Sequence, residues 1–246
     1  MTHHFVTALP VYNEAKTVSQ VLDEVAKYSQ HVLVVDDGST DGTAHLMTKR
    51  KDIAIVTHSP NRGYGAALAT AFRFAIDQKF EYLVTIDCDG QHEPQSILAF
   101  VDKCVSGNYD IVSGSRYLKV FAGDSEPPAE RKWINQQITN EINDSLQLNI
   151  TDAFCGFKAY RVASLRKLRI TEFGYAMPLE VWVQAACHKF RIKELPVPLI
   201  YLDAARTFGA TLDDPAVRLN YYHRVLDRCI GALPNDCEKL KVERQL

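Results

Sequence analysis

Short runs of apolar, mostly β-branched residues recur along the first half of the chain, separated by polar or small residues. The runs are Phe5–Leu9, Val32–Val35, Ile53–Thr57, Tyr82–Ile86 and Tyr109–Val112. Runs that are apolar at nearly every position are typical of strands buried on both faces of a sheet. The pattern therefore predicts a series of buried strands within about the first 115 residues.

Amphipathic segments lie between these predicted strands. Apolar residues three and four positions apart form stripes at Val18, Val21, Leu22 and Val25, and at Ala67, Leu68, Ala71, Phe72 and Ala75. That spacing indicates helices with one buried face. Because neighbouring parallel strands need a crossover connection, the alternation predicts an α/β fold with a doubly wound, mostly parallel sheet flanked by helices.

The pattern changes after Tyr117. Gly123–Glu130 is rich in proline and acidic residues and is expected to be a loop, either a lid that orders with a ligand or a passive connection. The next expected element is a long helix, whose apolar row is Ile134, Ile138, Ile142 and Leu146. It is followed by a short strand around Gly156–Tyr160, a helix near Met177–His188 and an extended stretch over Arg191–Tyr201. The last expected helix begins at Asp213-Asp214-Pro215 and carries the apolar stripe Val217, Tyr221, Val225 and Cys229.

Composition narrows the class of protein. The 246 residues are 46% hydrophobic and 24% charged with a net charge of -2, which is ordinary for a globular protein and argues against bulk electrostatic binding to nucleic acid. A chain of this length can bury a core without cross-links, so its cysteines, which form no Cys-x-x-Cys pair, are expected to be free thiols. No signal-peptide pattern and no membrane-spanning apolar stretch is visible, which predicts a cytoplasmic protein.

Polar, charged and glycine residues follow each predicted strand. In an open parallel sheet, ligands bind beyond the carboxyl ends of the strands, so these residues form the candidate site. They are Pro10, Tyr12, Asn13 and Glu14, then Asp36, Asp37, Gly38 and Ser39, then Asn61, Arg62, Gly63 and Gly65, then Asp87, Asp89, Gln91 and His92, and finally Gly114, Ser115 and Arg116.

Asp87 and Asp89 have the spacing that turns two side chains to the same side of an extended chain. Two carboxylates on one side are hard oxygen ligands that suit Mg²⁺ or Mn²⁺, and a diphosphate can supply the remaining ligands. Solvated acids in a loop can share this spacing, but the position of the pair at a strand end, followed by Gln91-His92-Glu93-Pro94, favours a metal site.

Two glycine-containing segments allow more than one interpretation. In Asp36–Thr43, Asp41 or Ser39 can cap a helix that starts near Gly42, whereas we interpret Asp37 as a ligand for a nucleobase or ribose. Asn61–Ala67 has too few glycines for a dinucleotide-binding motif. We expect its glycines to let the first turn of the following helix lie close to either another backbone or a ligand.

Taken in order, the motifs resemble a known family. They are Pro10-x-Tyr12-Asn13-Glu14, Val35-Asp36-Asp37-Gly38-Ser39-x-Asp41-Gly42-Thr43, Asp87-x-Asp89-x-Gln91-His92-x-Pro94, Gly114-Ser115-Arg116-Tyr117, Thr151-Asp152-x-x-Cys155-Gly156-Phe157-Lys158, Gly174-Tyr175 with Glu180, Glu194-Leu195-Pro196-Val197 and Arg206-x-x-Gly209. Together they are similar to family-2 glycosyltransferases of the GT-A fold, and among these most similar to dolichyl- or polyprenyl-phosphate mannosyl- and glucosyltransferases.

The resemblance implies a single GT-A domain over residues 1–233, with a nucleotide-binding half (1–118), an acceptor half that includes the C-terminal helix (119–233), and a polar tail (234–246). It implies Mg²⁺ or Mn²⁺ as the cofactor, with Asp87, Asp89 and Gln91 as ligands. The nucleotide-sugar contacts that it implies are Pro10, Tyr12, Glu14, Asp37, Gly63, Asp87 and Gln91. The phosphate and acceptor contacts are Arg116, Arg131, Lys158 and Arg206, and the catalytic residues are Asp89, Arg116, Asp152 and Glu180.

The sequence departs from the family pattern at two places. A Gly-Gly turn that members often have after Gly-Ser-Arg-Tyr is replaced by Lys119–Glu130, which is longer and acidic. The Ser-Lys-Leu-like ending of the last motif appears as Ala210-Thr211-Leu212, without the lysine, so one acceptor-phosphate contact of the family is missing. The membrane-spanning helices of many relatives have no counterpart, and the chain resembles the soluble catalytic-subunit type.

The chemistry of the acceptor favours a phosphate. A sugar hydroxyl needs a general base because its pKa is far above 7, whereas a phosphate monoester is already largely anionic at neutral pH. Acids are few at the motif positions of the later half, chiefly Asp152 and Glu180. Its basic residues are Arg131, Lys132, Lys158, Arg161 and Arg206.

We therefore predict a metal-dependent, inverting transfer of mannose or glucose from GDP-mannose or a UDP-hexose to a polyprenyl phosphate. The predicted location is the cytoplasm, with peripheral membrane or membrane-subunit contact at the inner membrane face. The alternatives are transfer to a saccharide hydroxyl in cell-envelope polysaccharide synthesis, a non-catalytic nucleotide-sugar-binding protein, and a nucleotidyltransferase. The last class needs a glycine-rich loop with a lysine after the first strand, and Pro10–Glu14 is not such a loop.

Overall fold

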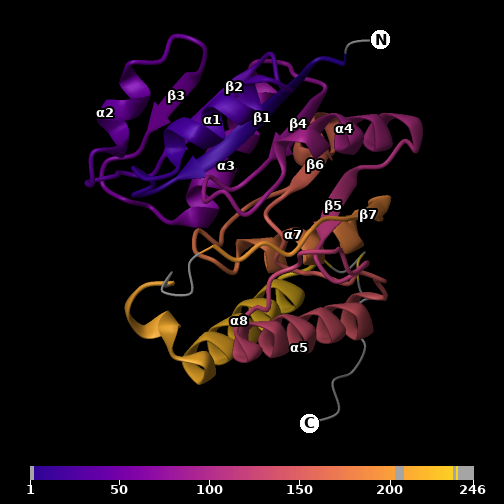
Figure 1. The fold of residues 1–246 in the computed structure, drawn as a ribbon. Coiled ribbons are helices and arrows are strands. Elements are labelled where there is room, and N and C mark those ends of the chain that lie inside the picture. Colours follow the sequence, from indigo (N-terminus) through magenta and orange to yellow (C-terminus); the bar gives the residue numbers. More distant parts are fainter. Residues whose placement is uncertain (1–2, 203–207, 235–236, 238–246) are drawn as a thin grey trace.

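The computed structural model describes residues 3–202, 208–234 and 237. A seven-stranded sheet in the order β3-β2-β1-β4-β6-β5-β7 forms its centre (Figure 1). The strands are β1 (Phe5–Val11), β2 (Val32–Asp36), β3 (Ala54–Thr57), β4 (Tyr82–Thr85), β5 (Ile111–Ser115), β6 (Lys158–Arg161) and β7 (Ile192–Pro196). The strands predicted from the apolar runs are all present, and the sheet is mostly parallel, as expected.

Helices connect most of the strands. They are α1 (Val18–Ala26), α2 (Thr43–Thr48), α3 (Tyr64–Asp77), α4 (Ile97–Ser106), α5 (Ala129–Leu146), α6 (Val162–Leu165), α7 (Met177–Cys187) and α8 (Pro215–Gly231), with short 3₁₀ helices at Pro94–Ser96 and Ala210–Asp213. Over the described ranges, none of these helices is both long and apolar enough to cross a bilayer.

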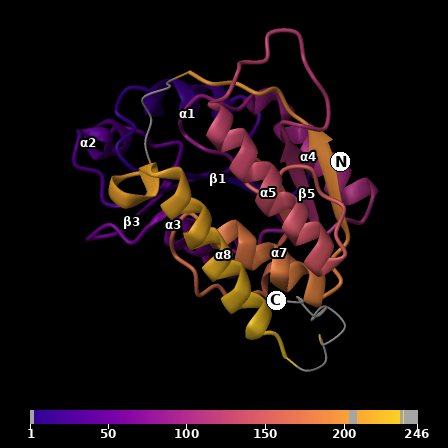
Figure 2. The same ribbon diagram turned by 90° about the horizontal axis from the view of Figure 1, so that it is seen from below.

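The helices cover both faces of the sheet. Along β1, Phe5 and Leu9 pack with α1, α2 and α4, whereas Val6 and Ala8 pack in the cluster that contains α3, α5, α7 and α8. This division follows from the alternation of side chains along a strand. The apolar stripes predicted for α1, α3 and α5 are all buried. Figures 1 and 2 show α5 and α8 side by side in the second layer.

Strand β6 joins the two halves of the chain. It lies between β4 and β5 and runs antiparallel to both, so a strand from the later half completes the sheet of the first half. Its pairing places Lys158 opposite Thr85 at the carboxyl end of β4. The apolar pattern predicted a strand here, but a run of four residues does not indicate its neighbours or its direction.

The buried stripe of α8 differs from the prediction by one position at its start. Val217 is 42% exposed, whereas Arg218 is 2% exposed and shares the buried face with Tyr222 and Val225. The predicted cap is confirmed, because Asp214 accepts hydrogen bonds from the backbone N–H groups of two residues in the first turn. Because arginine is rarely buried, an apolar periodicity favours the row through Val217 over the row through Arg218.

The expectation of free thiols is wrong for one pair. Cys187, at the end of α7, forms a disulfide with Cys237, and their Cα atoms are 5.3 Å apart. The other four cysteines, Cys88, Cys104, Cys155 and Cys229, are buried and form no disulfide. The two cysteines are 50 residues apart in the sequence, so no local pattern indicates that they lie close together.

Candidate active site

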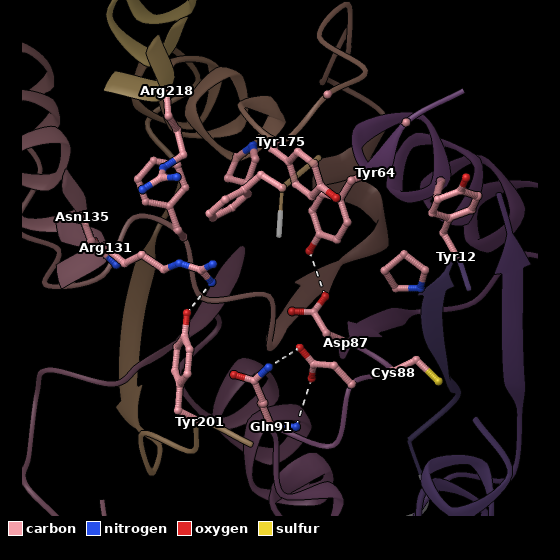
Figure 3. A pocket seen from close by; sticks show the side chains of 18 of the residues that line it. Tyr12, Tyr64, Asp87, Cys88, Gln91, Arg131, Asn135, Tyr175, Tyr201 and Arg218 are labelled. Carbon is pink, nitrogen blue, oxygen red and sulfur yellow. Dashed lines mark hydrogen bonds between the residues drawn. The ribbon is translucent and has the colours of Figure 1, made fainter. Parts of the chain in front are cut away.

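A cavity of about 460 Å³ lies beyond the carboxyl ends of the strands. Residues that follow β1 to β5 line one side of it, and residues from α5, α7, α8 and the segment after β7 line the other (Figure 3). The predicted site residues that the structure brings together here are Pro10, Tyr12, Glu14, Asp37, Gly63, Asp87, Asp89, Gln91, Arg116 and Arg131. Their convergence follows from the common edge at which parallel strands end.

Asp87 is held in place by residues from three different segments. The Tyr64 hydroxyl, at the start of α3, donates to Oδ1 at 3.0 Å (Figure 3). Nε2 of His92 lies 3.3 Å from Oδ2. Gly156 packs directly against the carboxylate, so closely that any side chain at residue 156 would displace it. Burial and the neighbouring negative charge of Asp87 raise the pKa of Tyr64 well above its ordinary value, so the hydroxyl remains a donor.

Asp89 lies beside Asp87 at the rim and is oriented by Gln91. The backbone N–H of Gln91 donates to Oδ1 at 3.0 Å and its side-chain amide donates to Oδ2 at 2.9 Å. Across the described part of the chain, no three His, Cys, Asp or Glu side chains come together as a complete metal site. Two carboxylates at one rim are hard oxygen ligands, and this donor set fits a divalent ion whose other ligands come from a diphosphate.

Asp37 is buried, with 3% exposure, and its carboxylate organises the loop after β3. It accepts hydrogen bonds from the backbone N–H groups of Arg62 at 2.9 Å and Gly63 at 2.7 Å, and Nδ1 of His58 lies 2.6 Å away. A Cβ on Gly63 would collide with the carbonyl oxygen of Phe173, so this glycine permits the close approach of another backbone. Both Asp37 and Gly63 also line the cavity.

The wall on the β1 side is built by a cross-connected pair of loops. The backbone N–H of Glu14 donates to Thr43 Oγ1 at 2.9 Å, and Asp41 accepts from the N–H of Ala15 at 3.0 Å. Thr17 connects this wall to the aspartate loop by donating to the carbonyl oxygen of Cys88 at 2.8 Å. Tyr12, on the same wall, is 47% exposed, which leaves its ring available to a ligand (Figure 3).

Arg116 enters the cavity from the end of β5 and is held by Asp152. Its Nε and Nη2 donate to the two carboxylate oxygens at 2.7 and 2.9 Å, and Asn135 Nδ2 donates to Oδ1 at 2.8 Å. Burial alone would raise the pKa of Asp152, but the charge of Arg116 and these hydrogen bonds outweigh it and lower the pKa to about 2. Asp152 is fully buried and is not among the lining residues, so its carboxylate positions Arg116.

Glu194, from the Glu-Leu-Pro-Val motif, supports the turn that carries Asp152. Its carboxylate accepts from the backbone N–H and hydroxyl of Thr151 at 2.9 Å and from the N–H of Asp152 at 3.2 Å. Burial, partly offset by these hydrogen bonds, raises the pKa of Glu194. The motif on β7 therefore supports the cavity indirectly, because Glu194 holds Asp152 and Asp152 holds Arg116, which lines the cavity.

Besides Asp152, two more predicted residues do not line the cavity, and one lies outside the described residues. Glu180 is buried at the start of α7, where its carboxylate accepts from the N–H groups of Thr171 and Glu172 at 2.8 Å. Lys158 is 3% exposed and donates to the carbonyl oxygen of Cys155, with its Nζ 5.4 Å from the Trp182 ring. Both were expected at the acceptor, and neither lines the cavity. Arg206 falls in the undescribed range 203–207.

The cavity lining also contains residues to which the sequence analysis gave no role. Most are aromatic, with one additional arginine. These lining residues are Tyr64, Tyr201, Phe208, Tyr222 and Arg218, and they join Tyr175 of the Gly174-Tyr175 motif. A helical row drawn through Arg218 and Tyr222 would have identified these two, but the scattered rings have no pattern along the sequence.

Comparisons with known proteins show the family and the fold of the chain. The sequence model described as Glycosyl transferase family 2 matches residues 7–169. An undecaprenyl-phosphate mannosyltransferase of Micrococcus luteus is 29% identical over 205 residues, which cover 79% of this chain and 83% of that protein. A polyprenol monophosphomannose synthase of Mycolicibacterium smegmatis is 28% identical over 207 residues, which cover 80% of this chain and 77% of that protein.

A solved structure shares the fold. It is glucosyl-3-phosphoglycerate synthase of Mycobacterium tuberculosis, in complex with Mn²⁺, uridine diphosphate and glucosyl-3-phosphoglycerate. The TM-score is 0.71 at 15% identity, and the match covers 95% of this chain and 82% of that chain. The likeness confirms the predicted GT-A fold.

Proposed function

Since the chain belongs to glycosyl transferase family 2, we propose that it transfers a hexose from a nucleoside diphosphate sugar to a polyprenyl phosphate. Membership of the family makes the chain a glycosyltransferase, so a purely binding role is set aside. The relatives named as acting on undecaprenyl phosphate and polyprenol phosphate support the acceptor class.

One observation carries the choice of acceptor. The carboxylates that line the cavity, Glu14, Asp37, Asp87 and Asp89, all come from the first half of the chain. From the later half, the described lining residues include Arg131 and Arg218 but no aspartate or glutamate. Among the described residues, the lining of the later half thus offers cations and no carboxylate, since Glu130, 3.7 Å from both arginines, is not a lining residue. This lining suits an acceptor that is already an anion.

The reaction needs no proton transfer in this proposal. An anionic oxygen of the acceptor phosphate attacks C1 of the sugar as the bond from C1 to the diphosphate oxygen breaks with inversion, and the diphosphate leaves with the bonding electrons. Asp152 does not serve as a base, since its pKa of about 2 makes it a weak proton acceptor and both its oxygens bond to other groups. Arg116, which it holds, provides fixed positive charge beside the phosphates.

The donor occupies the strand-end side. Pro10, Tyr12, Glu14 and Asp37 contact the nucleoside, and Asp87 and Asp89 hold a divalent ion together with the diphosphate, with Gln91 orienting Asp89. When bound, Mg²⁺ or Mn²⁺ neutralises the charge that develops on the leaving diphosphate. The neighbouring fold solved with Mn²⁺ and uridine diphosphate supports this arrangement.

The apolar lining supports an isoprenoid chain on the acceptor. Ile134, Leu199, Ile200, Phe154 and Pro178 line the later half together with the aromatic rings. Binding of a hydrocarbon chain to such a surface is favourable because apolar area is removed from water, whereas a saccharide acceptor would need more hydrogen-bonding groups. A lipid acceptor places the reaction at a membrane surface, and we propose that the protein works on the cytoplasmic side as a peripheral enzyme.

Transfer assays with a short isoprenyl monophosphate test the proposal. Purified protein is incubated with Mn²⁺, with GDP-mannose or a UDP-hexose, and with either farnesyl phosphate or farnesol, and products are measured by mass spectrometry. We expect a glycosyl phosphodiester with farnesyl phosphate from at least one donor and no product with farnesol. Transfer to an oligosaccharide hydroxyl, with farnesyl phosphate inert, would contradict the proposed acceptor.

A further inference from the structure

We propose that Arg218, on α8, is an acceptor-binding residue that receives the phosphate together with Arg131. The inference rests on the proposed function, because it names a residue that recognises the proposed acceptor. Neither the motifs nor the family match, which ends at residue 169, includes this position. Four features of the described structure carry it: burial, an incompletely bonded guanidinium, an aromatic support and a shared carboxylate.

Arg218 is a buried cation that faces the cavity. It is 2% exposed and lines the cavity wall, and Figure 3 shows its side chain descending from α8 toward Arg131. Burial of an arginine is rare unless the charge is paired. Nη1 donates to the carbonyl oxygen of Leu212 at 2.8 Å, but Nη2 has no hydrogen-bond partner among the described residues. A buried donor left in this state is expected to have a ligand.

The two arginines share one aromatic support. The guanidinium carbon of Arg218 lies 4.5 Å from the centre of the Phe208 ring, and that of Arg131 lies 4.8 Å from it. Stacking on a ring fixes the plane of a guanidinium while leaving its edge donors free to bind. Phe208 therefore holds both cations at the same end of the cavity.

The carboxylate of Glu130 shows that an anionic oxygen fits between these cations. Its Oε1 lies 3.7 Å from Nε of Arg131 and 3.7 Å from Nη2 of Arg218. These distances are those of an ion pair, longer than a hydrogen bond. Two cations around one carboxylate leave a net positive charge, so a phosphate dianion can approach and form the shorter bonds that Glu130 does not make.

Binding and kinetics of four proteins test the proposal: the wild type, Arg218→Gln, Arg218→Lys and Arg224→Gln. Arg224 lies on the same helix, is exposed and does not line the cavity, so it is the matched control. Farnesyl phosphate binding is measured by titration calorimetry, and KM is measured separately for farnesyl phosphate and for the sugar donor. Circular dichroism melts establish that each variant is folded.

We expect Arg218→Gln to weaken farnesyl phosphate binding and raise its KM by about 10- to 100-fold, because hydrogen bonds to a charged group are lost. The KM for the donor is expected to stay within about 2-fold of the wild-type value. The farnesyl phosphate affinity of Arg218→Lys is expected to lie between those of the wild type and Arg218→Gln, since lysine keeps the charge but not the planar fork. Arg224→Gln should bind as the wild type does. If Arg218→Gln does not fold, Arg218→Lys is compared with the wild type, and weaker farnesyl phosphate binding with an unchanged donor KM supports the proposal.

Two results would overturn the inference. One is unchanged affinity of the folded Arg218 variants for farnesyl phosphate. The other is an equal rise of donor and acceptor KM, which a purely structural role would produce. A wild type that neither binds nor glycosylates farnesyl phosphate, yet glycosylates a saccharide, instead contradicts the proposed function itself, so the two failures are distinguishable.

Discussion

At the residue scale, several acids of the motifs organise the protein before they can meet a ligand. Asp36 accepts from the N–H of Ser39 at 3.0 Å, and Asp37 holds the loop that contains Gly63. Asp152 holds Arg116 in a two-point ion pair. A motif acid therefore acts at one of two levels, either in contact with the ligand or by fixing the group that makes the contact.

The ion pair of Asp152 predicts a pH-dependent contribution to stability. The pKa of this carboxyl is about 2 in the folded protein, below the value of 3.8 for an unperturbed aspartate. Its contribution to folding is therefore complete above about pH 4 and is lost as the pH falls toward about 2. At about 1.4 kcal/mol per pKa unit, the pH-dependent part is about 2 kcal/mol.

Urea unfolding of the wild type and Asp152→Asn, from about pH 7 to about pH 3, measures this contribution. We expect the stability difference between the two proteins to be constant near neutral pH and to shrink below about pH 4. Asp144→Asn, at an exposed position of α5, is the control and should show no such change. A difference that stays constant over the whole range would contradict the ion-pair assignment.

At the element scale, α8 brings the second arginine to the cavity and is anchored at both ends. Near its middle and end, Tyr221 and Arg228 donate to Glu172, each at 2.6 Å. At its start, Asp214 Oδ1 accepts from the N–H groups of Ala216 at 2.8 Å and Val217 at 3.0 Å. Thr211, at the position of the family's lysine, belongs to the 3₁₀ turn Ala210–Asp213, and Arg218 belongs to the first turn of α8, which follows it.

The cap gives a prediction for this element. Asp214→Ala removes the acceptor for two N–H groups and is expected to lower the free energy of unfolding by about 1 kcal/mol, whereas Asp214→Ser keeps a cap and should lose less. Because the first turn carries Arg218, we also expect the alanine variant to raise the KM for farnesyl phosphate more than the KM for the donor. Denaturant unfolding and steady-state kinetics check both effects, and equal behaviour of the two variants would argue against the cap.

The loop after β5 is another element whose structure clarifies its role. Asp124 Oδ1 accepts from the N–H of Leu199 at 2.9 Å, and Ser125 exchanges hydrogen bonds with Leu199 and Tyr201. The loop is thereby paired with the segment that contributes Leu199, Ile200 and Tyr201 to the cavity. A lid movement of this loop stays a prediction, and its pairing connects it directly to the cavity wall.

At the scale of the whole molecule, the sheet joins the first and the later half of the chain, which we propose to bind donor and acceptor. Strand β6 lies between β4 and β5, so the aspartate loop after β4 and Arg116 after β5 flank a strand of the later half. Gly156, just before β6, is the residue that packs against Asp87. Binding at either side is therefore expected to stabilise the entire fold.

Thermal unfolding with donor analogues tests this expectation. A nucleoside diphosphate with Mn²⁺ at about 100 times its Kd should stabilise the protein by about 2.7 kcal/mol, which raises Tm by about 5 to 10 °C for a chain of this size. A chelator should remove most of the shift, and Asp89→Ala should abolish the part that depends on Mn²⁺. Asp102→Ala should behave as the wild type does, and a shift that survives chelation would contradict the metal assignment.

Comparison of predicted and observed residues shows which signals are local. Asp87, Asp89 and Arg116 were predicted to form the site at the strand ends, and all three line the cavity. The prediction was possible because each follows a strand that its apolar run identifies. Lys158 and Glu180 were predicted by the same kind of motif but point elsewhere. A motif determines the residue type and its place along the chain, and the direction of a side chain from a helix or a central strand depends on neighbours distant in sequence.

The sequence by itself determined the α/β class, the convergence of the strand-end residues on one site, the helix cap at Asp214 and the family. These features depend on periodicity and spacing within short segments, which the chain carries wherever it folds. Only the tertiary structure decided that β6 enters the sheet antiparallel, that α8 turns Arg218 inward, and that the described cavity lining of the later half contains guanidinium groups and no carboxylate. The physical reason is that burial and pairing between distant segments set these orientations, and local propensity does not encode them.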